Sequence, residues 1–122
     1  MSKPTTRKMS DEHEKFIQQL IGGRITPGSG NGFANQMDVR NSHEDGRWTY
    51  AADGKSTFAR SIGVTREMWA KAEAQSHDLT PLLPLRFYDD WSLRRSLDLV
   101  VIKAEDFGLL LYDAREHEYC RG

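Results

Sequence analysis

The sequence predicts a single α/β domain in which helices flank one mixed sheet. Segments with the apolar period of a helix alternate along the chain with short segments typical of strands. The expected order is α-β-β-β-α-β-β-α, which favours helices packed on both faces of the sheet. A length of 122 residues and a mass of 14.0 kDa suit one hydrophobic core. We therefore expect a flexible leader at residues 1–10 and one folded domain at 11–122.

The first helix is expected to follow this leader and to end near residue 21. Ser10 and Asp11 are candidate N-cap residues, and Gly22-Gly23 is typical of a helix end. The apolar stripe of this helix consists of Phe16, Ile17, Leu20 and Ile21. The four histidines are scattered, and we expect them to lie at the surface or to be partly packed.

Three short strands are expected next. Arg24-Ile25 and Met37–Val39 are the first two, separated by the Gly-rich segment Thr26–Gly32. Asp45-Gly46 is a common hairpin dipeptide. Trp48–Ala52, with aromatic residues at alternate positions, is the returning strand.

The sequence of the second half of the chain predicts a helix, two strands and a final helix. A helix is expected over residues 64–77, with Thr65 as its N-cap. Its inward face should carry Val64, Met68, Trp69 and Ala72. Pro81–Phe87 contains two prolines, which favour a strand near an edge or a bulge at Pro84. Residues 97–102 form the last strand, and 103–119 the last helix, with Phe107, Leu110 and Leu111 directed inward.

Composition excludes several classes of protein. The sequence has no run of about 18 apolar residues, as a membrane-spanning helix requires. Its first residues lack the apolar region of a signal peptide. One cysteine, Cys120, excludes an internal disulfide and a multi-cysteine zinc site. We expect a cytoplasmic protein.

The net charge of −1 is unevenly distributed. Residues 1–71 contain 11 Lys and Arg against 8 Asp and Glu, whereas residues 72–122 contain 6 against 10. A basic front half can present a positive face to DNA even when the net charge is near zero. Composition therefore leaves DNA binding open without indicating it.

The Gly-rich loop has two interpretations. No Gly-Lys-Ser/Thr follows it, and no helix opens after its glycines, so it is neither a P-loop nor a dinucleotide-binding fingerprint. It is either an ordinary surface loop or a row of backbone amides that binds phosphate, with Ser29 and Asn31 as further donors. Both interpretations stay open.

Asp38, Asp53 and Lys55 are the candidate chemical groups. On an extended strand Asp53 and Lys55 share a face, and a hairpin places Asp38 about 5 Å from them on the neighbouring strand. Two close carboxylates repel unless a cation lies between them, and Mg²⁺ binds such carboxylates together with phosphate oxygens. The lysine can orient a metal-bound water or stabilise charge on the phosphate. The alternative is a solvated turn at Asp53-Gly54-Lys55.

The order of several short motifs resembles the PD-(D/E)XK nuclease superfamily, over roughly residues 12–88. Within it the resemblance is to small, phage-type endonucleases similar to Holliday junction resolvases. The motifs are Glu14-Lys-Phe-Ile-Gln-Gln-Leu, Gly22-Gly-Arg, Pro27-Gly-Ser-Gly-Asn-Gly, Asp38-Val-Arg, Asp53-Gly-Lys55-Ser-Thr, Trp69-x-Lys71 and Pro81-Leu-Leu-Pro-Leu-Arg-Phe. The chain departs from the family pattern in having Gln36-Met37 before the aspartate, and Asp rather than Glu at position 53.

The resemblance implies a restriction-endonuclease-like sheet and a Mg²⁺-dependent endonuclease, with Mn²⁺ able to substitute. It implies that Glu14, Asp38 and Asp53 hold the metal, with Glu12 as the alternative to Glu14. Lys55 would assist the attacking water. The residues expected to contact DNA are Arg24, Gly28, Ser29, Gly30, Asn31, Arg40 and Lys71.

The implied substrate is branched DNA, with a four-way junction favoured. Because paired nicks need two sites, the resemblance also implies a homodimer, joined through residues 109–112 or the helix at 64–77. A nicking, flap or exonuclease activity would use the same residues. A catalytically inactive DNA-binding protein and a protein-interaction domain are the alternatives from other classes. Trp91 with Arg94-Arg95 is either a DNA contact or a charged loop.

Overall fold

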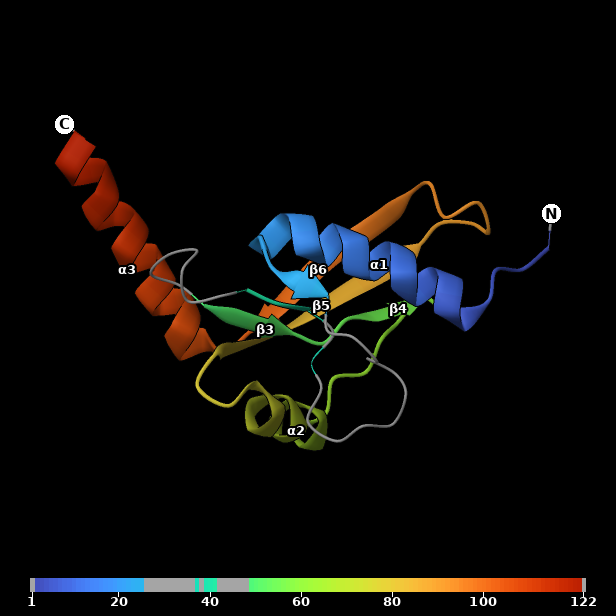
Figure 1. The fold of residues 1–122 in the computed structure, drawn as a ribbon, viewed down its shortest axis with the longest axis horizontal. Helices are drawn as coiled ribbons and strands as arrows, with labels where there is room; N and C mark the ends of the chain where they lie inside the picture. Colours follow the sequence, from blue (N-terminus) through green and yellow to red (C-terminus); the bar gives the residue numbers. More distant parts are fainter. Residues whose placement is uncertain (1, 26–36, 38, 42–48, 122) are drawn as a thin grey trace.

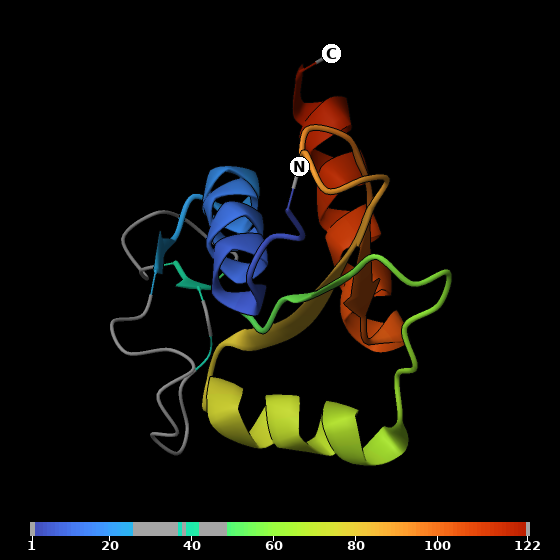
Figure 2. The same cartoon turned by 90° about the vertical axis from the view of Figure 1, so that its right-hand side faces the viewer.

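A computed structural model describes residues 2–25, 37, 39–41 and 49–121 (Figure 1). It is an α/β structure in which α1 covers one face of a mixed sheet and α2 the other (Figures 1 and 2). The elements are α1 (Thr6–Ile21), β1 (Arg24–Ile25), β2 (Val39–Arg40), β3 (Tyr50–Ala52), β4 (Lys55–Thr57), α2 (Arg66–Ser76), β5 (Thr80–Tyr88), β6 (Ser96–Ile102) and α3 (Ala104–Arg121). The coarse fold class agrees with the prediction, and the element order differs from it by one additional strand, β4.

Strands β3 and β4 form one row of the sheet. Both pair in parallel with β5, and the register is the same in each, Tyr50 with Thr80 and Lys55 with Leu85. β1, β2 and β3 pair antiparallel in that order, and β6 pairs antiparallel with the other side of β5. The sheet therefore has five rows, and Asp53-Gly54 interrupts the third without shifting its register.

Pro84 accounts for this interruption. The Thr80 amide donates to the Thr49 carbonyl at 2.9 Å, and the Asp53 amide donates to the Leu82 carbonyl at 3.1 Å. Because alternate residues of a parallel strand bond to the same neighbour, the amide at position 84 would face the Asp53 carbonyl, and proline has no N–H to donate. The prediction that this strand lies at an edge was wrong, since β5 is paired on both sides.

The core lies on both faces of the sheet. The cluster beneath α1 contains Ile17, Val39, Ala52 and Leu82. The cluster beneath α2 contains Met37, Ala51, Ala72 and Leu83. Consecutive residues of β3 and of β5 thus point to opposite faces, as strand geometry requires. Both faces of the sheet are therefore covered at β3 and at the start of β5, whereas Leu97, Leu99 and Val100 of β6 are exposed.

Helix α1 starts earlier than the sequence suggested. The Thr5 hydroxyl accepts a hydrogen bond from the Lys8 amide at 3.1 Å, so Thr5 is the N-cap and the predictions of Ser10 and Asp11 were wrong. Residues 6–10, assigned to the leader, are helical because Met9 is buried and its carbonyl accepts from the Tyr88 hydroxyl at 2.8 Å. The helix ends as predicted at Gly22, whose φ of 68° is left-handed.

The other two helices agree with the sequence prediction only in part. Thr65 caps α2 as predicted, and Met68, Trp69 and Ala72 pack inward, but Val64 precedes the helix and is exposed. Helix α3 projects from the body (Figure 1). The inward placement of Phe107 and Leu111 was wrong. The exposed apolar residues of α3 are Phe107, Leu109, Leu111 and Tyr112. They lie on several sides of the helix, so one neighbouring surface cannot cover them all.

Two earlier expectations depend on these helices. The homodimer expected to form through residues 109–112 or the helix at 64–77 stays a prediction. Within the described part of the chain, no helix combines the length and apolar character that crossing a membrane requires.

His13 is buried between α1 and the sheet, contrary to the surface or partly packed position expected for it. Its side chain is 2% exposed, and its Nε2 has no hydrogen-bond partner among the described residues. Burial, together with the positive charge of Arg86, lowers the pKa of His13 from 6.5 to about 4, although Asp98 opposes this. The imidazole is therefore neutral in the folded protein at pH 7.

We predict that His13 makes the fold less stable in mild acid. Between about pH 6.5 and pH 4 the unfolded chain binds a proton that the folded protein does not, so the free energy of unfolding falls as the pH falls. From pH 7 to pH 5 this loss amounts to about 2 kcal/mol. Urea denaturation of wild type and His13→Met at both pH values measures it. Between pH 7 and pH 5 the free energy of unfolding of His13→Met should fall by about 2 kcal/mol less than that of wild type. His77→Asn, at an exposed histidine, should lose as much stability as wild type.

Equal pH dependence in wild type and His13→Met would show that His13 is not a buried neutral group.

Candidate active site

Asp53 and Lys55 lie together on one face of the sheet. The Lys55 Nζ is 3.2 Å from Asp53 Oδ2, and both side chains are partly exposed, 40% for Lys55 and 25% for Asp53. Residues two apart on an extended strand point the same way, which places both side chains on the α2 face with Ala51. The expectation that they share a face is confirmed, and a tight turn at Gly54 is excluded because the register continues through it.

Gly54 points to the opposite face and touches α1. A Cβ at this position would lie 2.7 Å from Ile17 Cδ1 and 2.9 Å from His13 Nδ1. A side chain at residue 54 would force the Ile17 or His13 side chain to shift. The absence of a side chain at residue 54 thus lets α1 lie directly on the strand that carries Asp53 and Lys55 on its other side.

Glu14 and its alternative, Glu12, lie on different flanks of α1. The Phe16 ring lies under the Arg86 guanidinium, 4.5 Å from the ring centroid, and so marks the flank of α1 that faces β5. Glu12 is one turn from Phe16 on that flank and pairs with Lys15, Nζ to Oε1 at 3.7 Å. Glu14 is two residues from Phe16, about 200° around the helix, and lies on the flank away from β5.

Glu14 is half-buried next to His13, on the helix that covers the Gly54 face. The Asp53 and Lys55 side chains point to the opposite face of the sheet from this helix. Its part in the site stays a prediction.

Asp38 and the Gly-rich loop lie outside the described residues, so the predictions for Asp38, Gly28, Ser29, Gly30 and Asn31 stay untested. Asp38 directly precedes Val39 in the chain, and Val39 is the register partner of Ala52, which directly precedes Asp53. The side chain of Arg24 is likewise not among those described. Of the residues that are described, no three of His, Cys, Asp or Glu gather closely enough to hold a metal ion.

The remaining predicted DNA contacts occupy different positions. Arg40 is partly buried, and its Nη2 donates to the Gln75 carbonyl at 2.7 Å, where it binds the C-terminal end of α2. Lys71 is exposed on α2. The geometry therefore assigns Arg40 a structural contact and leaves Lys71 accessible.

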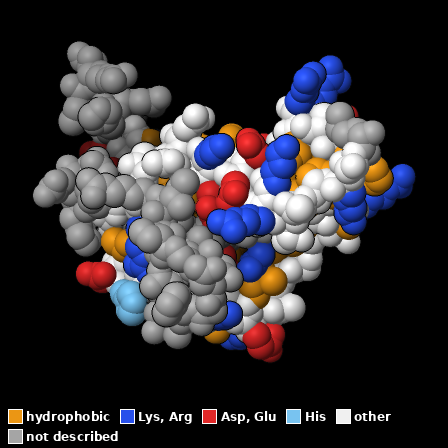
Figure 3. Space-filling model, turned by 45° about the vertical axis from the view of Figure 1, so that its right-hand side comes forward, with side chains coloured by type: hydrophobic (Ala, Val, Ile, Leu, Met, Phe, Trp, Pro, Cys, Tyr) orange, Lys and Arg blue, Asp and Glu red, His pale blue; other side chains and the backbone are white. Residues whose placement is uncertain are grey.

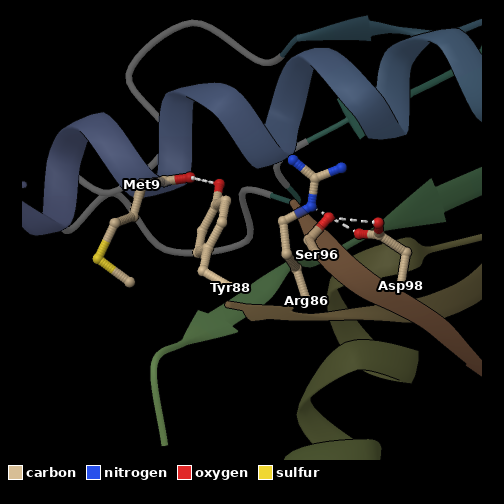
Figure 4. A network of polar contacts seen from close by, with 5 residues as sticks. All are labelled: Met9, Arg86, Tyr88, Ser96 and Asp98. Atoms are coloured by element: carbon tan, nitrogen blue, oxygen red, sulfur yellow. Dashed lines mark hydrogen bonds and ion pairs between the residues drawn. The ribbon is translucent and has the colours of Figure 1, made fainter. Parts of the chain in front are cut away.

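A polar network under α1 was not predicted (Figure 4). Arg86 is buried, and its Nε donates to Asp98 Oδ1 at 2.6 Å, while Ser96 donates to Asp98 Oδ2 at 2.8 Å. These residues alternate with apolar ones along β5 and β6, so all of them face α1. That alternation of polar and apolar residues is the sequence signal that could have revealed the network.

Lys and Arg side chains border a small group of Asp and Glu side chains on one face of the molecule (Figure 3). Such a mixture of charge can hold a cation at the carboxylates and an anion at the basic residues.

Comparison with models of known protein families, with curated proteins and with solved structures produced no match.

We predict that Gly54→Ala lowers the free energy of unfolding by about 1–3 kcal/mol, because the new methyl group must displace Ile17 or His13. Gly108→Ala is the matched control. A Cβ at Gly108, inside α3, meets nothing within 4 Å, so alanine there should be neutral or stabilising by up to about 1 kcal/mol. Chemical denaturation of the two variants measures both effects. A Gly54→Ala protein as stable as wild type would disprove the direct contact of α1 with this strand.

Proposed function

We propose that the protein is a metal-dependent DNA endonuclease of the PD-(D/E)XK class that acts on branched DNA. The observation that carries this proposal is the Asp53–Lys55 pair, two side chains on one strand face with Nζ and Oδ2 3.2 Å apart. Asp53 and Lys55 belong to the row of the sheet that β3 and β4 form. β3 pairs with β2, and Asp38 directly precedes β2 in the chain. The mixed sheet with helices on both faces is compatible with the restriction-endonuclease-like fold that the resemblance implies.

The donor set fits Mg²⁺. Carboxylate oxygens are the ligands this ion prefers, and the Asp53 side chain is partly exposed and so accessible to an ion and a phosphate. In the proposal Asp53 and Asp38 hold the metal, and Mn²⁺ can replace Mg²⁺. A bound Mg²⁺ supplies polarisation of the phosphate and a more acidic water.

Lys55 has a role separate from that of the carboxylates. Its ammonium group lies beside Asp53, so it is positioned to orient the attacking water and to stabilise the charge that grows on the phosphate. A group that acts in this way lowers the rate of cleavage more than the affinity for DNA when it is removed.

We predict that Asp53→Asn and Lys55→Ala each slow cleavage by about 100-fold or more under single-turnover conditions with Mg²⁺. A labelled four-way junction is the favoured substrate, tested beside linear duplex, single-strand and flap DNA. Affinity for the junction, measured with Ca²⁺, should change little. Asp78→Asn and Lys103→Ala are the matched controls, because both residues are exposed and lie outside the proposed site.

Cleavage at the wild-type rate by either site variant would remove that residue from the mechanism. If wild type binds the DNAs but cuts none of them with Mg²⁺ or Mn²⁺, the protein is instead an inactive DNA-binding relative of the class.

A further inference from the structure

A pocket of about 480 Å³ lies where β4 ends and β5 turns toward β6. It is lined by Phe58, Asp89, Asp90, Trp91 and Ser92. A volume in this range suits one small ligand or one group of a larger one. Trp91 is 47% exposed, so much of its indole stays available for contact. The pocket therefore combines an accessible aromatic surface with carboxylate acceptors.

The turn that carries Trp91 is held by its own hydrogen bonds. Asp90 Oδ1 accepts from the Ser92 amide at 2.8 Å and also from the Ser92 hydroxyl. The Asp89 amide donates to the Arg95 carbonyl at 3.0 Å, which closes the turn. These bonds hold the backbone before any ligand arrives, which reduces the entropy lost on binding.

Several basic residues are near the pocket residues in the chain or at the same end of β5, without lining the pocket. Arg94 and Arg95 follow the turn, and Arg60 follows Phe58, and all three are exposed. The hydrogen bond from Tyr88 to the Met9 carbonyl holds the start of α1, with its exposed Arg7 and Lys8, at the same end of β5 (Figures 1 and 4). Cations thus lie outside the pocket and carboxylates within it.

This arrangement selects the kind of group that can enter. The carboxylates of Asp89 and Asp90 repel a phosphate, but they can accept hydrogen bonds from the amino group of a base. A neutral base can stack on the Trp91 indole, while the phosphates on either side of it meet the arginines outside. A fully paired duplex cannot offer such a base without unstacking it.

We propose that this pocket binds one unpaired nucleotide of DNA, its base stacked on Trp91 and its phosphates against Arg94 and Arg95. Phe58 is three residues after Lys55, about 10 Å along the extended strand. The proposal rests on the proposed function, and it specifies the substrate as DNA with unpaired bases close to the cleavage site, as at a branch or a flap. The base is held near the Asp53–Lys55 pair but takes no part in hydrolysis.

The test measures affinity by fluorescence anisotropy in EDTA, so that no cleavage occurs. Three labelled DNAs are compared: a blunt duplex, the same duplex with a short unpaired extension, and that extension without bases. Wild type should bind the extended duplex at least about fivefold more tightly than the other two, the lower end of what one stacked base contributes. Equal binding of the extended and abasic DNAs, or binding to none of the three, overturns the proposal.

Variants at exposed aromatic residues assign the effect to the pocket. Trp91→Leu keeps an apolar side chain but cannot stack a base, and its affinities for the extended and abasic DNAs should become equal. Trp91→Phe should keep part of the preference. Phe107→Ala removes an exposed aromatic residue of α3 and should keep all of it. A Trp91→Leu protein that retains the wild-type preference overturns the proposal.

The outcome is independent of catalysis. A preference for unpaired bases that depends on Trp91, in a protein that cuts no DNA, would support the pocket and refute the nuclease. Metal-dependent cleavage without that preference would do the reverse.

Discussion

Helix α1 packs directly on the backbone of Gly54, where a side chain would collide with Ile17 and His13. Because side chains alternate along a strand, this contact directs Asp53 and Lys55 to the opposite face, where they remain partly exposed. Pro84 on β5 interrupts the ladder beside the same two residues. The segment that carries Asp53 and Lys55 therefore has α1 packed on one face, and it lacks one hydrogen bond to the neighbouring strand β5.

Polar contacts along α1 support this packing. The Tyr88 hydroxyl donates to the Met9 carbonyl near the start of α1, and Arg86 stacks on Phe16 in its middle. At its end the side-chain amide of Asn41 donates to the Ile21 carbonyl at 3.3 Å. Burial of His13 Nε2, which has no hydrogen-bond partner in the described part of the chain, opposes them. We interpret the helix as fixed in position, so that the pair on the other face is held ready for a ligand before binding.

Local signals in the sequence predicted much of this arrangement. The caps at Gly22 and Thr65, and the shared face of Asp53 and Lys55, follow from short-range rules of helices and strands. The interior position of Pro84 could not be predicted, because its missing N–H matters only opposite the neighbouring strand. His13 between Met9 and Ile17 continues a helical stripe, but burial of this imidazole follows from tertiary packing alone. The exposed apolar residues of α3 show equally that apolar character did not determine burial.

The central claim is that the face carrying Asp53 binds a divalent metal, and thermal unfolding in the presence of Mg²⁺ tests it most directly. An ion that binds only the folded protein raises its melting temperature as its concentration rises. We predict such a rise for wild type and for Asp78→Asn, and little or none for Asp53→Asn, each compared with the same protein in EDTA. An equal rise in wild type and Asp53→Asn, or none in wild type with either Mg²⁺ or Mn²⁺, would contradict the account.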